Sequence, residues 1–193
     1  MVSAEQDAVE PDTKDWTWVL ERPCPDCGFD SRTVGRAQVP QLLRAASARW
    51  VRVLGEGEAT RRRPDPSVWS PLEYGCHVRD VFRRFDARLR LMLSEDDPRF
   101  ENWDQDAAAR DGAYGEQDPA GVSAELAEAG ERLAAGFEAV PEQAWQRPAR
   151  RSDGAGFTVE SLSRYLVHDV VHHVHDVTGE LADPAGGHQS ERW

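Results

Sequence analysis

Residues 69–92 read WSPLEYGCHVRDVFRRFDARLRLM, and this stretch has the clearest helix signature in the chain. Ser70 can cap the helix, Pro71 suits its first position, and Glu73 completes a capping box. Behind these signals, apolar residues recur at helical spacing: Tyr74, Val78, Val81, Phe82, Phe85, Leu89 and Met92. The stretch therefore predicts an amphipathic helix that ends near Ser94.

Three further segments show helical spacing of apolar residues. One begins near Val39-Pro40 and reaches residue 54, a second covers residues 123–140 before Pro141, and a third runs from Thr158 to about Val177. No alternating strand pattern, internal repeat or Gly-x-Gly-x-x-Gly motif accompanies them. The sequence therefore predicts an all-α fold, a four-helix bundle with long connections.

The segments outside these helices are polar. We expect a disordered acidic tail at residues 1–15, an N-terminal extension at 16–37, the bundle at 38–178 and a flexible C-terminal tail at 179–193. The acidic connection of residues 95–121 has only Trp103 and Tyr114 as large anchors. A connection of this length is a candidate lid or partner surface, and a merely solvated loop is an equal alternative.

Charge and composition exclude several classes of protein. The 193 residues suit one ordinary domain. With 23 Lys and Arg against 35 Asp and Glu, the net charge is −12, which disfavours nucleic-acid binding. No apolar run approaches the roughly 20 residues of a membrane span, and no secretory signal is visible. We expect a cytoplasmic protein without a membrane partner. The sequence leaves open whether the chain forms a homodimer.

Four of the six histidines lie within eight residues of the last predicted helix, in the stretch HDVVHHVH that starts at His168. His168 and His172 are four residues apart and share one helix face, so both imidazoles can approach one metal ion. His175 returns to within about 20° of the same face, at about 100° per residue. A metal needs at least a third ligand, and His77 lies in a helix that can pack nearby.

These features resemble a known family. The run from Trp69 to Glu73 followed by His77, together with His168-x-x-x-His172, resembles the DinB/YfiT-like superfamily over roughly residues 38–178. The superfamily includes thiol-dependent S-transferases and the mycothiol-dependent maleylpyruvate isomerase. The resemblance implies that His77, His168 and His172 hold one divalent metal, with zinc or nickel favoured and iron or manganese also suitable.

The resemblance also implies chemistry. It predicts a metal-dependent enzyme, an S-transferase or isomerase, that activates a small thiol for transfer to an electrophilic substrate, with a low-molecular-weight thiol as possible cofactor. Many relatives have Gln three residues after the last ligand, where this chain has His175, so His175 is a candidate outer-shell group. Asp169 is a second candidate, because its carboxylate could orient an imidazole N–H. Two other interpretations stay open: a non-catalytic, metal-stabilised binding or stress-response module, and a bundle whose histidines bind nothing.

Two further motifs allow alternative sites. The stretch from His168 to His172 is similar to a zincin HExxH motif with Asp in place of Glu, although no downstream ligand completes a protease pattern. Cys24-Pro25-Asp26-Cys27 resembles half a zinc ribbon, or a redox Cys-x-x-Cys without the expected βαβ context. Cys76 and His77 could complete a Cys₃His zinc site, which would remove His77 from the bundle site.

Overall fold

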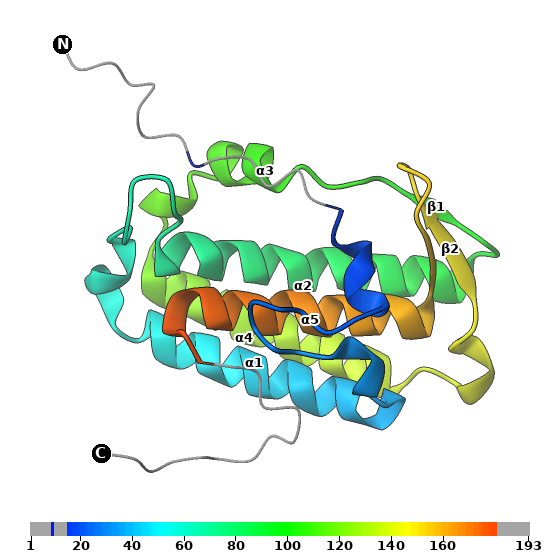
Figure 1. Ribbon diagram of the computed structural model, residues 1–193. Coiled ribbons are helices and arrows are strands. Elements are labelled where there is room, and N and C mark those ends of the chain that lie inside the picture. Colours follow the sequence, from blue (N-terminus) through cyan, green and yellow to red (C-terminus); the bar gives the residue numbers. More distant parts are fainter. Residues whose placement is uncertain (1–8, 10–14, 181–193) are drawn as a thin grey trace.

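Four long helices form the core of the chain, of which the computed structural model describes residue 9 and residues 15–180. They are α1 (Val39–Leu54), α2 (Pro71–Ser94), α4 (Pro119–Glu138) and α5 (Val159–Thr178). Helices α4 and α5 each pack against both α1 and α2 (Figure 1). The predicted four-helix bundle is therefore confirmed.

Short elements connect and flank the bundle. They are α3 (Gln105–Asp111), the strands β1 (Arg99–Phe100), β2 (Pro148–Arg151) and β3 (Gly156–Thr158), and the 3-10 helices η1 (Trp16–Leu20), η2 (Ser31–Thr33), η3 (Arg36–Gln38), η4 (Gly57–Arg61), η5 (Tyr114–Glu116) and η6 (Glu142–Ala144). Strand β2 pairs parallel with β1 and antiparallel with β3, at one end of the bundle (Figure 1). The sequence did not predict this sheet, because strands of two to four residues are too short to show alternation.

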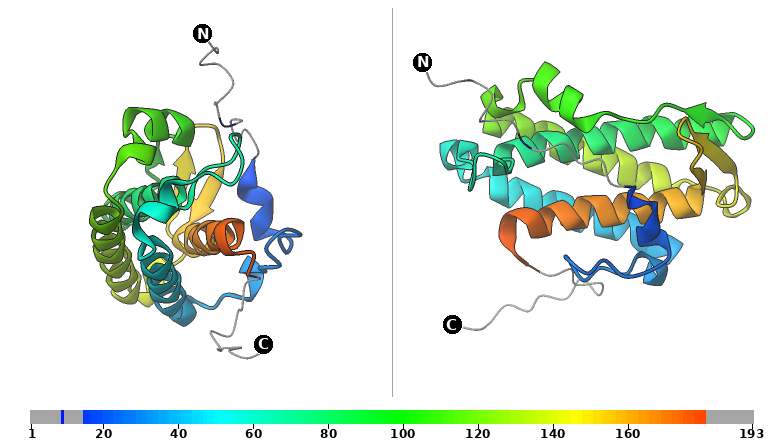
Figure 2. Two further views of the ribbon diagram at one scale, coloured as in Figure 1. Left: turned by 90° about the vertical axis from the view of Figure 1, so that its left-hand side faces the viewer. Right: turned by 45° about the horizontal axis from the view of Figure 1, so that its top comes forward.

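The N-terminal extension lies on the outer side of α5. Both η1 and η2 contact α5, and the connecting segment crosses the front of that helix (Figures 1 and 2). Most of the two predicted tails, residues 1–15 and 179–193, lies outside the described residues, as does His188. Within the described part of the chain, none of the helices combines the length and apolar character that a membrane span requires.

Capping side chains fix where the two site-bearing helices begin. At the start of α2, the Ser70 hydroxyl accepts the Glu73 N–H at 3.2 Å, and the Glu73 carboxylate accepts the Ser70 N–H at 2.7 Å. Helix α5 starts with a similar exchange between Thr158 and Ser161 and ends at Gly179, which adopts a left-handed conformation with φ of 69°. Both starts agree with the sequence prediction.

The capping carboxylate of α2 is also a buried ion-pair partner. The Glu73 side chain is only 9% exposed, and Arg63 donates to it at 2.5 and 2.9 Å. Burial would raise the pKa of Glu73, but the hydrogen bonds from Arg63 and Ser70 outweigh burial and lower that pKa below 4.5. Glu73 therefore stabilises the fold at pH values above its unfolded-state pKa, and this contribution is lost as the pH falls below it.

We expect Glu73→Gln to lower the free energy of unfolding by about 1.5–3 kcal/mol at neutral pH, the usual value of hydrogen bonds to a charged group. Urea unfolding at neutral pH and near pH 3.5 measures the difference between wild type and variant at both conditions. The difference should shrink at the acidic pH, and an equal difference at both would contradict the assignment. Glu58→Gln, which alters an exposed ion pair with Arg61, is the matched control and should have little effect.

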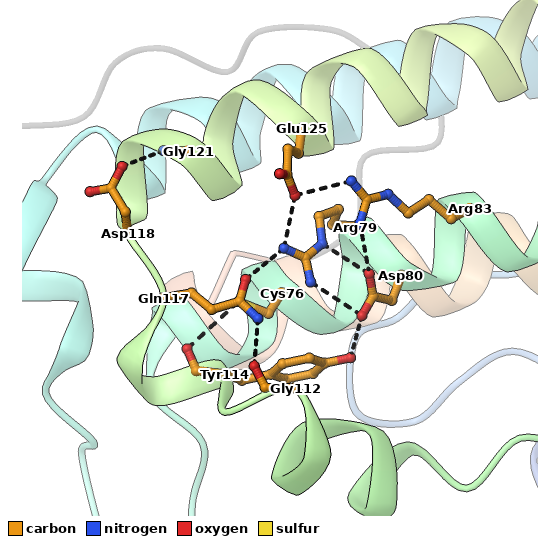
Figure 3. Close-up of polar contacts among 10 residues, drawn as sticks. All are labelled: Cys76, Arg79, Asp80, Arg83, Gly112, Tyr114, Gln117, Asp118, Gly121 and Glu125. Carbon is orange, nitrogen blue, oxygen red and sulfur yellow. Dashed lines mark hydrogen bonds and ion pairs between the residues drawn. The ribbon is translucent and has the colours of Figure 1, made fainter.

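The long acidic connection is folded onto α2 rather than open. The Tyr114 hydroxyl donates to Asp80 at 2.6 Å, while Arg79 donates to Gln117 at 2.6 Å and to Glu125 of α4 at 3.0 Å (Figure 3). Because Tyr114 is also buried, it is an anchor as the sequence indicated. The predicted loop of residues 95–121 thus contains β1, α3 and η5, and it places Trp103 beside α2.

Candidate metal centre

Three of the four histidines of α5 belong to two groups of potential metal ligands, in each of which one donor atom per residue lies within 4.8 Å of the others. The first group consists of His77, Asp169 and His173; the second consists of Cys24, Cys27, His168 and His172. The first lies between α2 and α5, and the second between α5 and the N-terminal extension.

The structure does not place His77 in one group with His168 and His172, the three residues that the sequence predicts as a single site. One residue turns an α-helix by about 100°. His168 and His172 therefore share one face of α5, which the N-terminal extension covers, whereas Asp169 and His173 share the next face, which meets α2. Asp169, expected as an outer-shell group, is itself a potential ligand.

In the first group, Asp169 lies between two imidazoles. Its Oδ1 is 3.9 Å from Nε2 of His77 and 3.9 Å from Nε2 of His173. The two rings are perpendicular, with centroids 4.8 Å apart. Nδ1 of His173 donates to Asp176 at 2.8 Å, so its Nε2 is left to face Asp169. The group thus presents two imidazole nitrogens and one carboxylate oxygen.

His77 provides the clearest test of whether a metal fits. Its side chain is 1% exposed, and neither ring nitrogen makes a hydrogen bond with the described residues. Burial, together with repulsion from His173, lowers the pKa of His77 well below 6.5, so the ring is neutral at neutral pH. A buried polar ring without a hydrogen bond is costly, and a divalent cation would relieve that cost. Two imidazoles and a carboxylate form a ligand set that zinc and similar metals accept.

Aromatic rings surround the buried side of this group. Trp103 stacks on His77 with centroids 5.1 Å apart and planes 3° apart, and Trp69 lies 5.5 Å from the same ring. Tyr74 lies 5.3 Å from the ring of His173. The side chains of Asp169 and His173 remain 22% and 18% exposed. The side of the group formed by these two residues is therefore partly open to solvent and small molecules.

Positive charge lies next to the aromatic rings. The guanidinium of Arg84 stacks over Trp103 at 4.7 Å, and Arg88 of the same helix is buried against the rings of Phe85 and Phe100. Burial and the charges of Arg84 and Arg151 lower the pKa of Arg88 to about 10, so it still carries its charge at neutral pH. These arginines favour anionic groups beside the potential metal ligands.

Two other predicted residues lie outside both groups. His175 donates from Nδ1 to the carbonyl oxygen of Glu180 at 3.1 Å and is not grouped with other ligands. Cys76 donates to the carbonyl oxygen of Tyr114 at 3.7 Å, so it does not join the cysteine pair in a Cys₃His site. The sequence prediction also missed His173. His173 lies four residues after Asp169, the same spacing as between His168 and His172. This spacing could have indicated a second pair of ligands on one helix face.

Comparison with known proteins agrees with this architecture. The model of the DinB superfamily matches residues 41–177, so the chain belongs to this superfamily. A search of curated proteins found no match.

Two solved structures have a similar fold. The first is YfiT from Bacillus subtilis, described as a probable metal-dependent hydrolase with an unusual four-helix bundle topology; its TM-score is 0.67 at 21% identity, with 75% of this chain and 84% of YfiT covered. The second is the mycothiol-dependent maleylpyruvate isomerase, with a TM-score of 0.59 at 14% identity and 77% of this chain covered. The match spans 62% of the isomerase.

Proposed function

We propose that the chain is a metal-dependent enzyme in which His77, Asp169 and His173 hold one divalent cation and a small thiol is activated for transfer to an electrophilic substrate. The observation that carries the proposal is the buried His77 ring, which makes no hydrogen bond with the described residues and faces a carboxylate and a second imidazole. The similarity in fold to a metal-dependent and to a thiol-dependent protein supports the choice of chemistry.

The residues around the proposed metal would each have a separate role. His77 stays neutral because it is buried, so it offers a lone pair at neutral pH. Asp176 fixes the orientation of His173 through the hydrogen bond at Nδ1. A bound divalent cation supplies Lewis acidity and lowers the pKa of a coordinated thiol. Trp69 and Trp103 exclude water from the buried side of the ligands.

The arginines beside the site support a choice of substrate. Arg84 stacks over Trp103, and Arg88, four residues further along α2, keeps its charge at neutral pH, so two positive charges lie on this part of α2. An electrophile that carries a carboxylate is therefore favoured over a neutral one. We propose small unsaturated or activated carboxylic acids as the substrate class, with the thiol as the second reactant.

The test is turnover of the full-length chain with a small thiol and a carboxylate-bearing electrophile, before and after metal depletion. We expect stoichiometric metal after purification, activity that falls to background with a chelator, and recovery when zinc, nickel, iron or manganese is restored. His175→Ala, which lies outside both ligand groups, is the control and should keep both metal and activity. Activity that is unchanged after complete metal removal would exclude the proposed mechanism.

A non-catalytic, metal-stabilised module is the other interpretation, and the same experiment separates the two. Such a module would bind metal at His77, Asp169 and His173 and would unfold at a lower temperature after chelation. It would show no turnover with any combination of thiol and electrophile.

A further inference from the structure

The second group of ligands joins two parts of the chain that are far apart in sequence. Cys24 and Cys27 belong to the N-terminal extension, whereas His168 and His172 lie on α5. Cys24 and His172 are 148 positions apart, yet the Cys24 Sγ lies 3.6 Å from Nδ1 of His172. We propose that these four residues form a closed, tetrahedral zinc site that fastens the N-terminal extension to the bundle.

The geometry of the four donors matches zinc. With zinc–sulfur and zinc–nitrogen bonds of about 2.3 and 2.0 Å, tetrahedral angles place a sulfur and a nitrogen ligand about 3.5 Å apart. The observed separation of 3.6 Å between Cys24 Sγ and His172 Nδ1 is close to this value. Nε2 of His168 is buried and makes no hydrogen bond with the described residues. Thiolate and imidazole in a tetrahedral S₂N₂ set are typical of zinc.

The cysteine loop has the shape that such a site needs. The Gly28 N–H donates to the carbonyl oxygen of Cys24 at 3.0 Å, and the Cys24 N–H donates to that of Phe29 at 2.9 Å. These bonds close a tight turn around Cys27. Gly28 has φ of 73°, a conformation that side chains disfavour, so the turn requires a glycine after the second cysteine.

The contact of His172 with Asp176 and the cover over the site both indicate that the metal has a structural role. Nε2 of His172 lies 3.5 Å from Asp176, which leaves Nδ1 to face Cys24, as is usual for a metal-bound histidine. The rings of Trp16 lie 5.8 Å from His168 and 5.1 Å from His172, so η1 covers the group. A covered site with four protein ligands has no open position for a substrate, which is the mark of structural zinc.

Charge balance favours zinc over empty thiols. Two thiolates and one divalent cation sum to zero, so the buried site carries no net charge.

The test uses cobalt(II) alone as a probe of the reduced, metal-free, full-length chain. We expect one cobalt ion to give intense near-ultraviolet absorption from thiolate-to-cobalt charge transfer, and zinc to abolish it by displacement. Cys24→Ser and Cys27→Ser should each lower the affinity more than about 100-fold, since even outer-shell groups contribute roughly 10–100-fold. Cys76→Ser removes a buried cysteine outside the group and is the matched control; it should keep the absorption.

Two more variants keep the result interpretable. His172→Cys preserves four donors and should still bind cobalt, with stronger charge-transfer absorption from a third thiolate, even if the serine variants fold poorly. His77→Ala should leave the absorption unchanged, so this site is judged separately from the proposed enzyme activity. Absent charge-transfer absorption in the reduced wild type, or equal loss in Cys76→Ser, would overturn the proposal.

Discussion

Replacement of His77 by alanine is expected to remove metal from the first group and leave metal in the second. Among the described residues His77 is one of three donors in its group, and loss of a direct ligand should lower the affinity by more than about 100-fold, the upper range for outer-shell partners. Catalysis of thiol transfer should fall to background when this metal is lost. Metal content and turnover measured on the same preparation check both expectations.

Because His77 is buried against Trp103, its removal also leaves a cavity that could destabilise α2. Asp169→Asn is therefore a second variant: its side chain is partly exposed, and the change removes charge with almost no change in volume. It should also lose metal from the first group. If both variants fold, keep wild-type metal content and keep activity, the assignment of this group is contradicted.

Asp176→Asn is expected to weaken both groups at once. Its Oδ2 accepts the hydrogen bond from Nδ1 of His173 at 2.8 Å, and its Oδ1 lies 3.5 Å from Nε2 of His172. Burial would raise the pKa of Asp176, but the hydrogen bond from His173 and the adjacent imidazoles lower it, so it is a carboxylate at neutral pH. One carboxylate therefore orients an imidazole in each group.

Loss of an outer-shell carboxylate typically lowers metal affinity by roughly 10–100-fold, and we expect a decrease of this size at each of the two groups. Competition with a chromogenic chelator measures both affinities in the same titration. Asp86→Asn, which alters an ion pair with Arg90 on the surface of α2, is the control and should leave both unchanged. A decrease at one group alone would show that Asp176 does not support both.

Much of the fold could be predicted from sequence because its helix signals are local. The capping box at Ser70 and Glu73 and the start of α5 at Thr158 depend on residues three positions apart, and the structure has both. The start of α4 was predicted four residues late, at Ser123, because Asp118 and Pro119, which cap and begin the helix, were assigned to the acidic connection. The small sheet depends on pairing between β1 and β2, which short strands do not reveal.

The site could be predicted only in part. Spacing places His168 and His172 on one face, and Asp169 and His173 on the next, but it does not say which face turns toward α2. That choice depends on how α5 is rotated about its own axis, which tertiary packing decides. The sequence prediction places His168 and His172 in the bundle site, so no histidine of that pair is left to complete a metal site with Cys24 and Cys27. In the structure, α5 turns the face of Asp169 and His173 toward α2. The neighbouring face of His168 and His172 therefore meets Cys24 and Cys27.

The central claim is that adjacent faces of α5 hold two different metal sites, and anomalous diffraction from crystals of the zinc-loaded, reduced full-length chain tests it most directly. We predict one zinc peak about 2.3 Å from the sulfurs of Cys24 and Cys27 and about 2.0 Å from nitrogens of His168 and His172, and a second peak within about 2.2 Å of His77, Asp169 and His173. A single peak bound jointly by His77, His168 and His172 would contradict the account.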